Sequence, residues 1–210
     1  MKRVVRGGRD RSLARVVRQM RGLVPSPILR PMPEPNTRWY AWPGTVSGNS
    51  PDDYVAAWRR VHRVAKRASG GWVKVMWAPY HRNIPARAAN APAAYFPGDE
   101  YVDLVGASGY NFGRQRGLRW ISPSGLFTSS YRTITGLSDR PFWIAETATT
   151  ARGGSKAGWM RALAALPARL PRLNGIVWYD VRDGKGDFRV RQSRATLRAF
   201  RAFLRRAGAR

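Results

Sequence analysis

Short apolar segments that alternate with segments of helical periodicity limit the fold of this chain more than any other feature. The apolar segments are residues 28–29, 73–77, 102–106, 141–145 and 175–179. The segments with apolar side chains at helical spacing are residues 13–23, 54–65, 154–166 and 197–204. Short apolar strands that alternate with helices are typical of a parallel sheet covered on both faces. The pattern therefore predicts an α/β fold with about five parallel strands.

The segment from Ser50 to Asp53 carries the pattern of a helix N-terminus. Ser50 can cap the first turn, and Pro51 suits the first helical position. The two aspartates that follow lie near the positive end of the helix dipole. We therefore expect a helix to begin here, with apolar side chains of residues 54–65 on one face.

The chain is strongly basic, with 38 Lys and Arg against 12 Asp and Glu and a formal net charge of +26. Such a charge favours polyanionic partners, among them nucleic acid and anionic polymers. The basic residues are almost all Arg and are spread along the whole chain, whereas a specific nucleic-acid module more often concentrates them in one stripe. Composition therefore leaves two explanations of the high positive charge open, which are non-specific polyanion binding and a coding bias toward Arg.

Composition also excludes several kinds of site and segment. Cysteine is absent, so neither a disulfide nor a thiolate metal site can form. No stretch approaches the roughly 20 apolar residues of a membrane helix, and no apolar segment follows the basic N-terminus as in an export signal. We therefore expect no membrane insertion, and the sequence leaves the localisation undecided.

Two of the three glutamates follow predicted strands. Glu34 comes after residues 28–29 and Glu146 directly after residues 141–145. Active sites of α/β folds form at the carboxyl ends of strands, and retaining glycoside hydrolases need two carboxyl groups ~5 Å apart. On the residues alone, Glu34 and Glu146 predict either such a pair or two strand-end carboxylates that bind Arg. Glu100 lies in a turn, where we expect it to be solvated.

Aromatic side chains gather at the same strand ends. They are Trp39, Tyr40 and Trp42 after Glu34, Tyr110 after residues 102–106, and Trp178 and Tyr179 at the end of residues 175–179. Flat aromatic faces can serve as platforms for sugars, but they also pack well in cores and loops. Together these aromatics favour a sugar site at this end of the sheet, although packing explains any single one of them.

Several segments, in their order along the chain, resemble glycoside hydrolase family 26, the β-mannanase family. They are Leu29–Asn36 with Trp39–Trp42 for the acid/base region, Tyr95–Asn111 for the sixth barrel strand and its entry, Trp143–Glu146 for the nucleophile strand, and Ile176–Tyr179 for the eighth strand. The resemblance extends from Gly8 to Phe200. It implies a (β/α)8 barrel of the TIM type.

The resemblance also implies a role for each residue that matches these motifs. Glu34 would be the general acid/base and Glu146 the nucleophile of a retaining mechanism, which implies no metal and no organic cofactor. The residues expected to bind substrate are Asn36, Trp39, Trp42, Tyr110 and Trp178, with Tyr110 also a hydrogen-bond partner of the nucleophile. The implied activity is hydrolysis of a β-linked polysaccharide or oligosaccharide, in the manner of an endo-β-1,4-mannanase, in an extracellular setting.

Two positions depart from the family pattern. Pro33 stands where the family usually has a His before its acid/base glutamate, and Ser108 stands where it commonly has an acid. Both departures remove a polar or charged neighbour from the expected site. They weaken the assignment of the sugar more than the assignment of the fold.

The acid/base strand is the fourth of eight in this family, but it is the first strand predicted in this chain. Residues 1–210 are therefore expected to form a single, partial catalytic domain, with flexible basic ends at residues 1–8 and 206–210. An open barrel leaves two rows of unpaired backbone groups. We therefore expect either that the first three strands are lost or that a partner or missing segment completes the barrel.

Two other functions stay open on the sequence. A catalytically inactive relic of the same fold would bind carbohydrate without hydrolysing it. A basic nucleic-acid-binding protein would bind DNA with a steep salt dependence and would have no affinity for mannan or glucan. The sequence contains no nucleic-acid motif, so we rank this alternative last.

Overall fold

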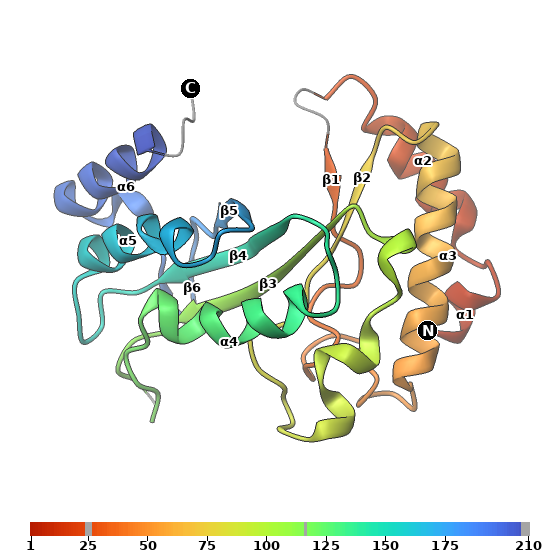
Figure 1. Cartoon of the computed structure of the whole chain (residues 1–210), viewed down its shortest axis with the longest axis horizontal. Helices are drawn as coiled ribbons and strands as arrows, with labels where there is room; N and C mark the ends of the chain where they lie inside the picture. The colour runs from red at the N-terminus through yellow and green to blue at the C-terminus, as the bar shows by residue number, and fades with distance from the viewer. Residues whose placement is uncertain (24–26, 116, 207–210) are drawn as a thin grey trace.

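One parallel sheet of five strands forms the centre of the protein (Figure 1). The structure is a computed structural model that describes residues 1–23, 27–115 and 117–206. Its sheet consists of β1 (Ile28–Leu29), β2 (Lys74–Trp77), β3 (Leu104–Asn111), β4 (Phe142–Thr149) and β5 (Leu173–Trp178). The strands are parallel and lie in their sequence order. The predicted set of five parallel strands is confirmed.

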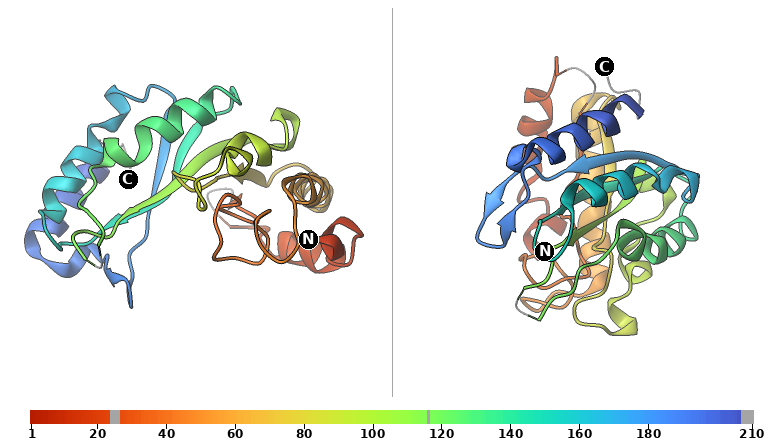
Figure 2. Two further views of the ribbon diagram at one scale, coloured as in Figure 1. Left: turned by 90° about the horizontal axis from the view of Figure 1, so that it is seen from below. Right: turned by 90° about the vertical axis from the view of Figure 1, so that its left-hand side faces the viewer.

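Helices connect the strands and cover one side of the sheet. The α-helices are α1 (Lys2–Val5), α2 (Asp10–Gln19), α3 (Pro51–Ser69), α4 (Pro123–Thr135), α5 (Lys156–Ala164) and α6 (Arg194–Arg206). Short 3-10 helices are η1 (Ala88–Asn90), η2 (Pro92–Tyr95), η3 (Asp99–Tyr101), η4 (Leu166–Ala168) and η5 (Val190–Gln192), and a hairpin is formed by β6 (Arg182–Asp183) and β7 (Gly186–Asp187). Figure 2 shows the sheet curled into an arch with the helices along its outer side. This is the architecture of a partial TIM-type barrel, as predicted.

The start of α3 shows how the sequence determines a local structure. The side chain of Ser50 accepts a hydrogen bond from the amide of Asp53 over 3.0 Å, and the Asp53 carboxylate accepts one from the amide of Ser50 over 3.0 Å. This reciprocal arrangement is a capping box, which satisfies two amides that the helix cannot pair itself. The helix ends at Gly70, whose φ of +65° suits glycine. The helix start predicted at Ser50 is confirmed.

The main core lies between the sheet and the outer helices. Its largest fully buried side chains include Trp58 on α3, Trp77 on β2, Phe127 on α4 and Phe142 on β4. Burial of an aromatic or large aliphatic side chain stabilises a fold by about 1.5–3 kcal/mol relative to leaving it exposed. This layer therefore holds the helices against the strands.

A second, smaller cluster lies on the inner face of the arch. It contains Met76, Ala78, Leu104 and Ala145, with Ile28 and Trp143 packed against it. Successive side chains of a strand point to opposite faces, and Trp77 and Ile144 belong to the main core, so their neighbours Met76 and Ala145 face inward. A Cβ atom at Gly175 would lie 2.4 Å from the Trp143 ring, so β5 requires glycine where this indole crosses it.

Helix α4 and strands β3 and β4 differ from the sequence expectation. Helix α4 lies in a segment for which we predicted no helix. Strands β3 and β4 are longer than predicted and reach Asn111 and Thr149. Consequently, Tyr110 and Glu146 lie inside strands rather than after them.

The predicted flexible ends remain untested. Residues 1–8 include the short helix α1, and residues 207–210 of the C-terminal segment lie outside the described residues. Within the part of the chain that the structure describes, no helix has both the length and the apolar composition to cross a bilayer.

Candidate active site

Glu34 lies in the loop after β1, where the backbone takes a left-handed conformation. Its φ is +56° and that of Met32 is +42°, a region that residues other than glycine rarely adopt. The amide of Glu34 donates to the carbonyl of Ala78 over 2.9 Å, and Oγ1 of Thr37 donates to the carbonyl of Glu34 over 2.7 Å. Strain of this kind collects at functional sites and persists only where the surroundings hold it. These contacts therefore fix the backbone from which the Glu34 side chain projects.

Asn36 anchors the same loop to the segment that follows β2. Its side chain is fully buried. Nδ2 donates to the carbonyl of Tyr80 over 2.9 Å, and Oδ1 accepts from the amide of Tyr80 over 2.8 Å. The carbonyl of Asn36 accepts from Nδ2 of Asn90 over 3.0 Å. Asn36 thus uses its polar atoms within the protein and does not line the pocket around Glu34, and its predicted contact with sugar stays a prediction.

The carboxyl group of Glu34 has a raised pKa, and burial is the main cause. Glu34 is only 5% exposed, and burial disfavours the charged form of a carboxyl. The negative charge of Glu146 raises the pKa further, whereas the indole of Trp39 opposes the rise, because its Nε1 donates to Oε2 of Glu34 over 2.6 Å. Glu34 therefore keeps its proton to higher pH than an ordinary glutamate, which suits a general acid.

Glu146 projects from β4 and accepts hydrogen bonds from residues near two other strands. Nη2 of Arg30, directly after β1, donates to Oε2, and the hydroxyl of Tyr110 on β3 donates to Oε1. Nη1 of Arg30 also donates to the carbonyl of Ala145 over 2.9 Å and to Oγ of Ser108 over 3.2 Å. A guanidinium and a hydroxyl on its two oxygens stabilise the charged carboxylate.

Changes in strand register turn Glu146 toward the inner face of the sheet. The pairing of β3 with β4 shifts between Ala107 and Ser108, and that of β4 with β5 shifts between Ile144 and Thr147. Ala145 faces inward, so strict alternation would turn Glu146 outward, into the helix layer. Irregularities of this kind are common beside active sites because they re-aim a side chain.

Glu34 and Glu146 line one pocket with a volume of about 460 Å³, a size typical of ligand sites. Its aromatic lining consists of Trp39, Tyr40, Tyr80, Tyr110, Phe112, Tyr179 and Phe188. Trp39 is 49% exposed and Tyr40 is 38% exposed. The rings of Trp39 and Tyr80 pack edge to face, with their centroids 5.1 Å apart. The pocket therefore combines two carboxyl groups with flat aromatic surfaces that a ligand can reach.

A second cavity, of about 540 Å³, adjoins this pocket. The residues common to both linings are Tyr80, Arg82, Tyr110, Phe112 and Leu118. Trp120 and His81 also line the second cavity, and burial lowers the pKa of His81 to about 4. The His81 imidazole is therefore neutral at ordinary pH. Within the described residues, no group of three or more His, Cys, Asp or Glu side chains is placed to hold a metal ion.

Two predicted substrate residues, Trp42 and Trp178, lie outside the pocket. Nε1 of Trp42 donates to the carbonyl of Pro33 over 2.7 Å, and its ring stacks on Tyr40 with centroids 4.4 Å apart. Nε1 of Trp178 donates to the carbonyl of Phe188 over 3.0 Å. Both indoles thus support residues that line the pocket. The structure brings together Glu34, Glu146, Trp39 and Tyr110 from the predicted set, and it leaves Asn36, Trp42 and Trp178 behind the lining.

Arg30 and Tyr80 belong to the site although sequence reasoning assigned them no role, and Tyr179 belongs to it as one of the aromatics expected at this end of the sheet. Arg30 follows β1, Tyr80 follows β2 and Tyr179 follows β5. For Arg30 and Tyr80, the position at the carboxyl end of a strand is the signal that could have identified them. Of the adjacent aromatics Trp178 and Tyr179, only Tyr179 lines the pocket, because successive residues of a strand point to opposite faces.

Comparison with known proteins assigns the chain to a family. A sequence model described as glycosyl hydrolase family 26 matches residues 11–146. The chain belongs to glycosyl hydrolase family 26. The match covers more than half of the sequence and contains both pocket glutamates, Glu34 and Glu146. The resemblance predicted from the motifs is therefore confirmed.

The family 26 chain is similar to a curated protein and to solved structures. Endoglucanase H of Acetivibrio thermocellus is 28% identical over 200 residues, which are 93% of this chain and 22% of that protein. The β-mannanase BoMan26A of Bacteroides ovatus is 19% identical with a TM-score of 0.65, over 95% of this chain and 58% of that one. The catalytic domain of a Bacillus sp. JAMB-750 endo-β-1,4-mannanase is 16% identical with a TM-score of 0.66, over 93% and 56%.

The chain spans only part of each of these proteins. The chain spans about a fifth of the curated relative's length and a little more than half of the two solved chains. At such low sequence identity, the solved structures support the TIM-type fold of the half-barrel. The activity and substrate of this chain have to be argued from its own site.

Proposed function

We propose that this family 26 chain is a retaining glycoside hydrolase, with Glu34 as general acid/base and Glu146 as nucleophile. One observation carries the proposal: two glutamates line the same pocket in opposite electrostatic settings. Glu34 is buried with a raised pKa, whereas Glu146 accepts from Arg30 and Tyr110. A retaining mechanism begins with one protonated and one charged carboxyl group.

The reaction proceeds in two steps. In the first, the Glu146 carboxylate attacks the anomeric carbon and forms a glycosyl ester while Glu34 gives its proton to the departing glycosidic oxygen. In the second, Glu34 takes a proton from water, whose oxygen attacks the anomeric carbon and releases Glu146. Arg30 and Tyr110 hold the Glu146 carboxylate in position throughout, because small displacements of reacting groups cost rate.

The proposed substrate is a β-1,4-linked polysaccharide, with mannan first and glucan second. The exposed Trp39 and Tyr40 provide flat surfaces beside the two carboxyl groups. The names of similar proteins include endo-β-1,4-mannanases and an endoglucanase. Release of reducing ends from galactomannan and from a mixed-linkage glucan by the purified chain distinguishes the two substrates.

Glutamate variants test the assigned roles. Glu146→Gln and Glu34→Gln should each lower kcat by at least about a thousandfold, whereas Glu100→Gln should leave it unchanged, because Glu100 is exposed and outside the pocket. Azide should rescue Glu146→Ala by forming an α-glycosyl azide and Glu34→Ala by forming the β-anomer. Equal kcat values for the Glu146→Gln, Glu34→Gln and Glu100→Gln variants would refute the assignment.

The carbohydrate-binding relic is the alternative within the same fold. A parent chain that binds mannan but hydrolyses neither mannan nor aryl mannosides would favour it. A chain that binds DNA with a steep salt dependence and has no affinity for either polysaccharide would favour the nucleic-acid alternative. Hydrolysis with retention of the anomeric configuration, followed by NMR of the first product, would favour the enzyme.

A further inference from the structure

Helix α2 carries a row of arginines on one side. Arg11, Arg15 and Arg18 follow one another at spacings of four and three residues, which places them on one face of the helix. All three are exposed. Like charges at such spacings repel one another and destabilise an isolated helix. The row therefore concentrates positive charge on one face of α2.

Helix α3 carries a second row beside the first. Arg60, Arg63 and Arg67 follow at spacings of three and four residues, and α2 packs against α3. A groove of about 670 Å³ lies between the two helices, with Arg11, Arg15, Arg18 and Arg67 in its lining. A smaller cavity of about 180 Å³, lined by Arg60, Arg63 and Arg67, adjoins it. We call these six residues the groove arginines.

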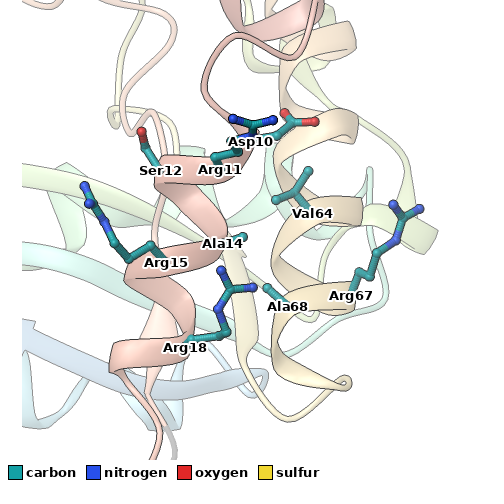
Figure 3. Close-up of a pocket in the computed structure, with 9 residues that line it drawn as sticks. All are labelled: Asp10, Arg11, Ser12, Ala14, Arg15, Arg18, Val64, Arg67 and Ala68. Atoms are coloured by element: carbon teal, nitrogen blue, oxygen red, sulfur yellow. The ribbon is translucent and has the colours of Figure 1, made fainter.

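Figure 3 shows how the groove is built. Arg11 and Arg18 lie between the helices, whereas Arg15 points away from α3 and Arg67 points away from α2. The small side chains of Ala14 and Ala68 are also part of the lining. Small residues in the lining allow a polymer to approach the helices closely, within reach of Arg11 and Arg18.

A single carboxylate lies in this groove, and Arg60 binds it. Asp10 accepts from Nε of Arg60 over 3.0 Å and from Nη2 over 2.7 Å. The hydrogen bond from Arg60 lowers the pKa of Asp10. Among the described residues, the other five groove arginines form no ion pair. The groove therefore presents positive charge that no acidic side chain of the described structure balances.

We propose that the α2–α3 groove binds an acidic polysaccharide through the groove arginines. Guanidinium groups bind carboxylates in a bidentate geometry that lysine does not reproduce. Proteins that bind single-stranded nucleic acid add aromatic platforms for the bases, and none of the described residues that line the groove is aromatic. The choice of a polysaccharide rests on the proposed function, since an enzyme of polysaccharides meets such polymers together with its substrate.

The test compares two triple variants that lose the same charge. Arg11→Gln/Arg15→Gln/Arg18→Gln removes the α2 row, whereas Arg161→Gln/Arg198→Gln/Arg201→Gln removes exposed arginines of α5 and α6. Sodium polygalacturonate is the probe, its fully methyl-esterified form is the uncharged control, and Kd is measured by titration calorimetry. We expect the groove triple to weaken binding about tenfold and to flatten its salt dependence, because fewer counterions are released. The α5/α6 triple should change Kd less than about twofold.

Three outcomes would overturn the proposal. They are equal weakening by the two triples, tight binding of the methyl-esterified polymer, and a groove triple that loses duplex DNA binding while it retains polygalacturonate binding. Glutamine is a good helix former, and circular dichroism of each variant verifies that α2 is intact. Polygalacturonate binding is measured without turnover. A chain that hydrolyses neither mannan nor glucan would therefore refute the proposed function and would leave the result of this binding test unaffected.

Discussion

Arg30 and Glu146, 116 residues apart in sequence, form an ion pair beside the pocket that contains both glutamates. Their side chains are 23% and 22% exposed, so water screens the pair less than it screens a surface ion pair. The same guanidinium reaches Ser108 on β3. Arg30 therefore links the end of β1 to β3 and to β4, and it holds the proposed nucleophile against both.

Replacement of Arg30 should slow the chemical step more than it weakens substrate binding. Arg30→Met removes the cation that stabilises and aims the Glu146 carboxylate, so kcat should fall about a hundredfold with little change in KM. Arg30→Lys keeps the charge but cannot reproduce both guanidinium contacts. Its kcat should therefore lie between that of the parent and that of Arg30→Met. Kinetics on an aryl β-glycoside check the order. An Arg30→Met enzyme with the parent kcat would contradict the assigned role.

Trp39→Phe should move the basic limb of the pH profile to higher pH. The Trp39 indole donates to Glu34 and lowers its pKa, so its loss raises the pKa of the acid that must be protonated in the first step. The phenyl ring keeps an aromatic surface in the pocket. The measurement is kcat/KM against pH, which reports groups of the free enzyme. A basic limb that stays in place or moves to lower pH would show that Trp39 does not tune Glu34.

Glu34→Gln should stabilise the fold at neutral pH while it removes activity. Burial raises the pKa of Glu34 above its ordinary value of 4.5, so the charged form destabilises the folded state at pH above the raised pKa. The gain in the free energy of unfolding should be about 1 kcal/mol at pH 7 and should vanish as the pH falls below 4.5. Urea unfolding at several pH values measures it, with Glu100→Gln as the control that changes neither stability nor its pH dependence.

Asn36→Ala should destabilise the protein by about 3 kcal/mol, because it leaves several buried backbone groups without partners. Asn49→Ala, at a half-buried side chain that also donates to two carbonyls, should cost less than about 1 kcal/mol. Thermal and urea unfolding compare them. A change in KM for Asn36→Ala without loss of stability would instead support the sugar contact implied by the family resemblance.

The sequence predicted the strands, three of the four longest helices and the pairing of Glu34 with Glu146 in one site. Helix α4 escaped prediction because its sequence from Pro123 to Thr135 is rich in Ser and Thr and contains Gly125, all of which have weak or poor helix propensity. Burial of Phe127 and Tyr131 against the sheet overrides that preference. Helix propensity is a property of the local sequence, so it does not include this stabilisation by tertiary packing.

Details of the site were harder to predict because they depend on strand register. Whether Glu146 faces the pocket or the helix layer is decided by register shifts on both sides of β4. Whether Trp178 or Tyr179 faces the pocket depends on one position along β5. The motif located the correct strand end in each case, and the side chain that enters the pocket became clear only from the paired strands.

The strand order has a consequence for how this protein is made. Strands β1 to β5 pair in their order of synthesis. Each strand after β1 therefore finds its partner already made when it leaves the ribosome, and pairing closes only the loop between neighbouring strands. The pocket is different, because Arg30 and Glu146 meet only after β4 has joined. The chain can therefore build most of its arch before Glu34 and Glu146 share a pocket, so the proposed active site forms late in its assembly.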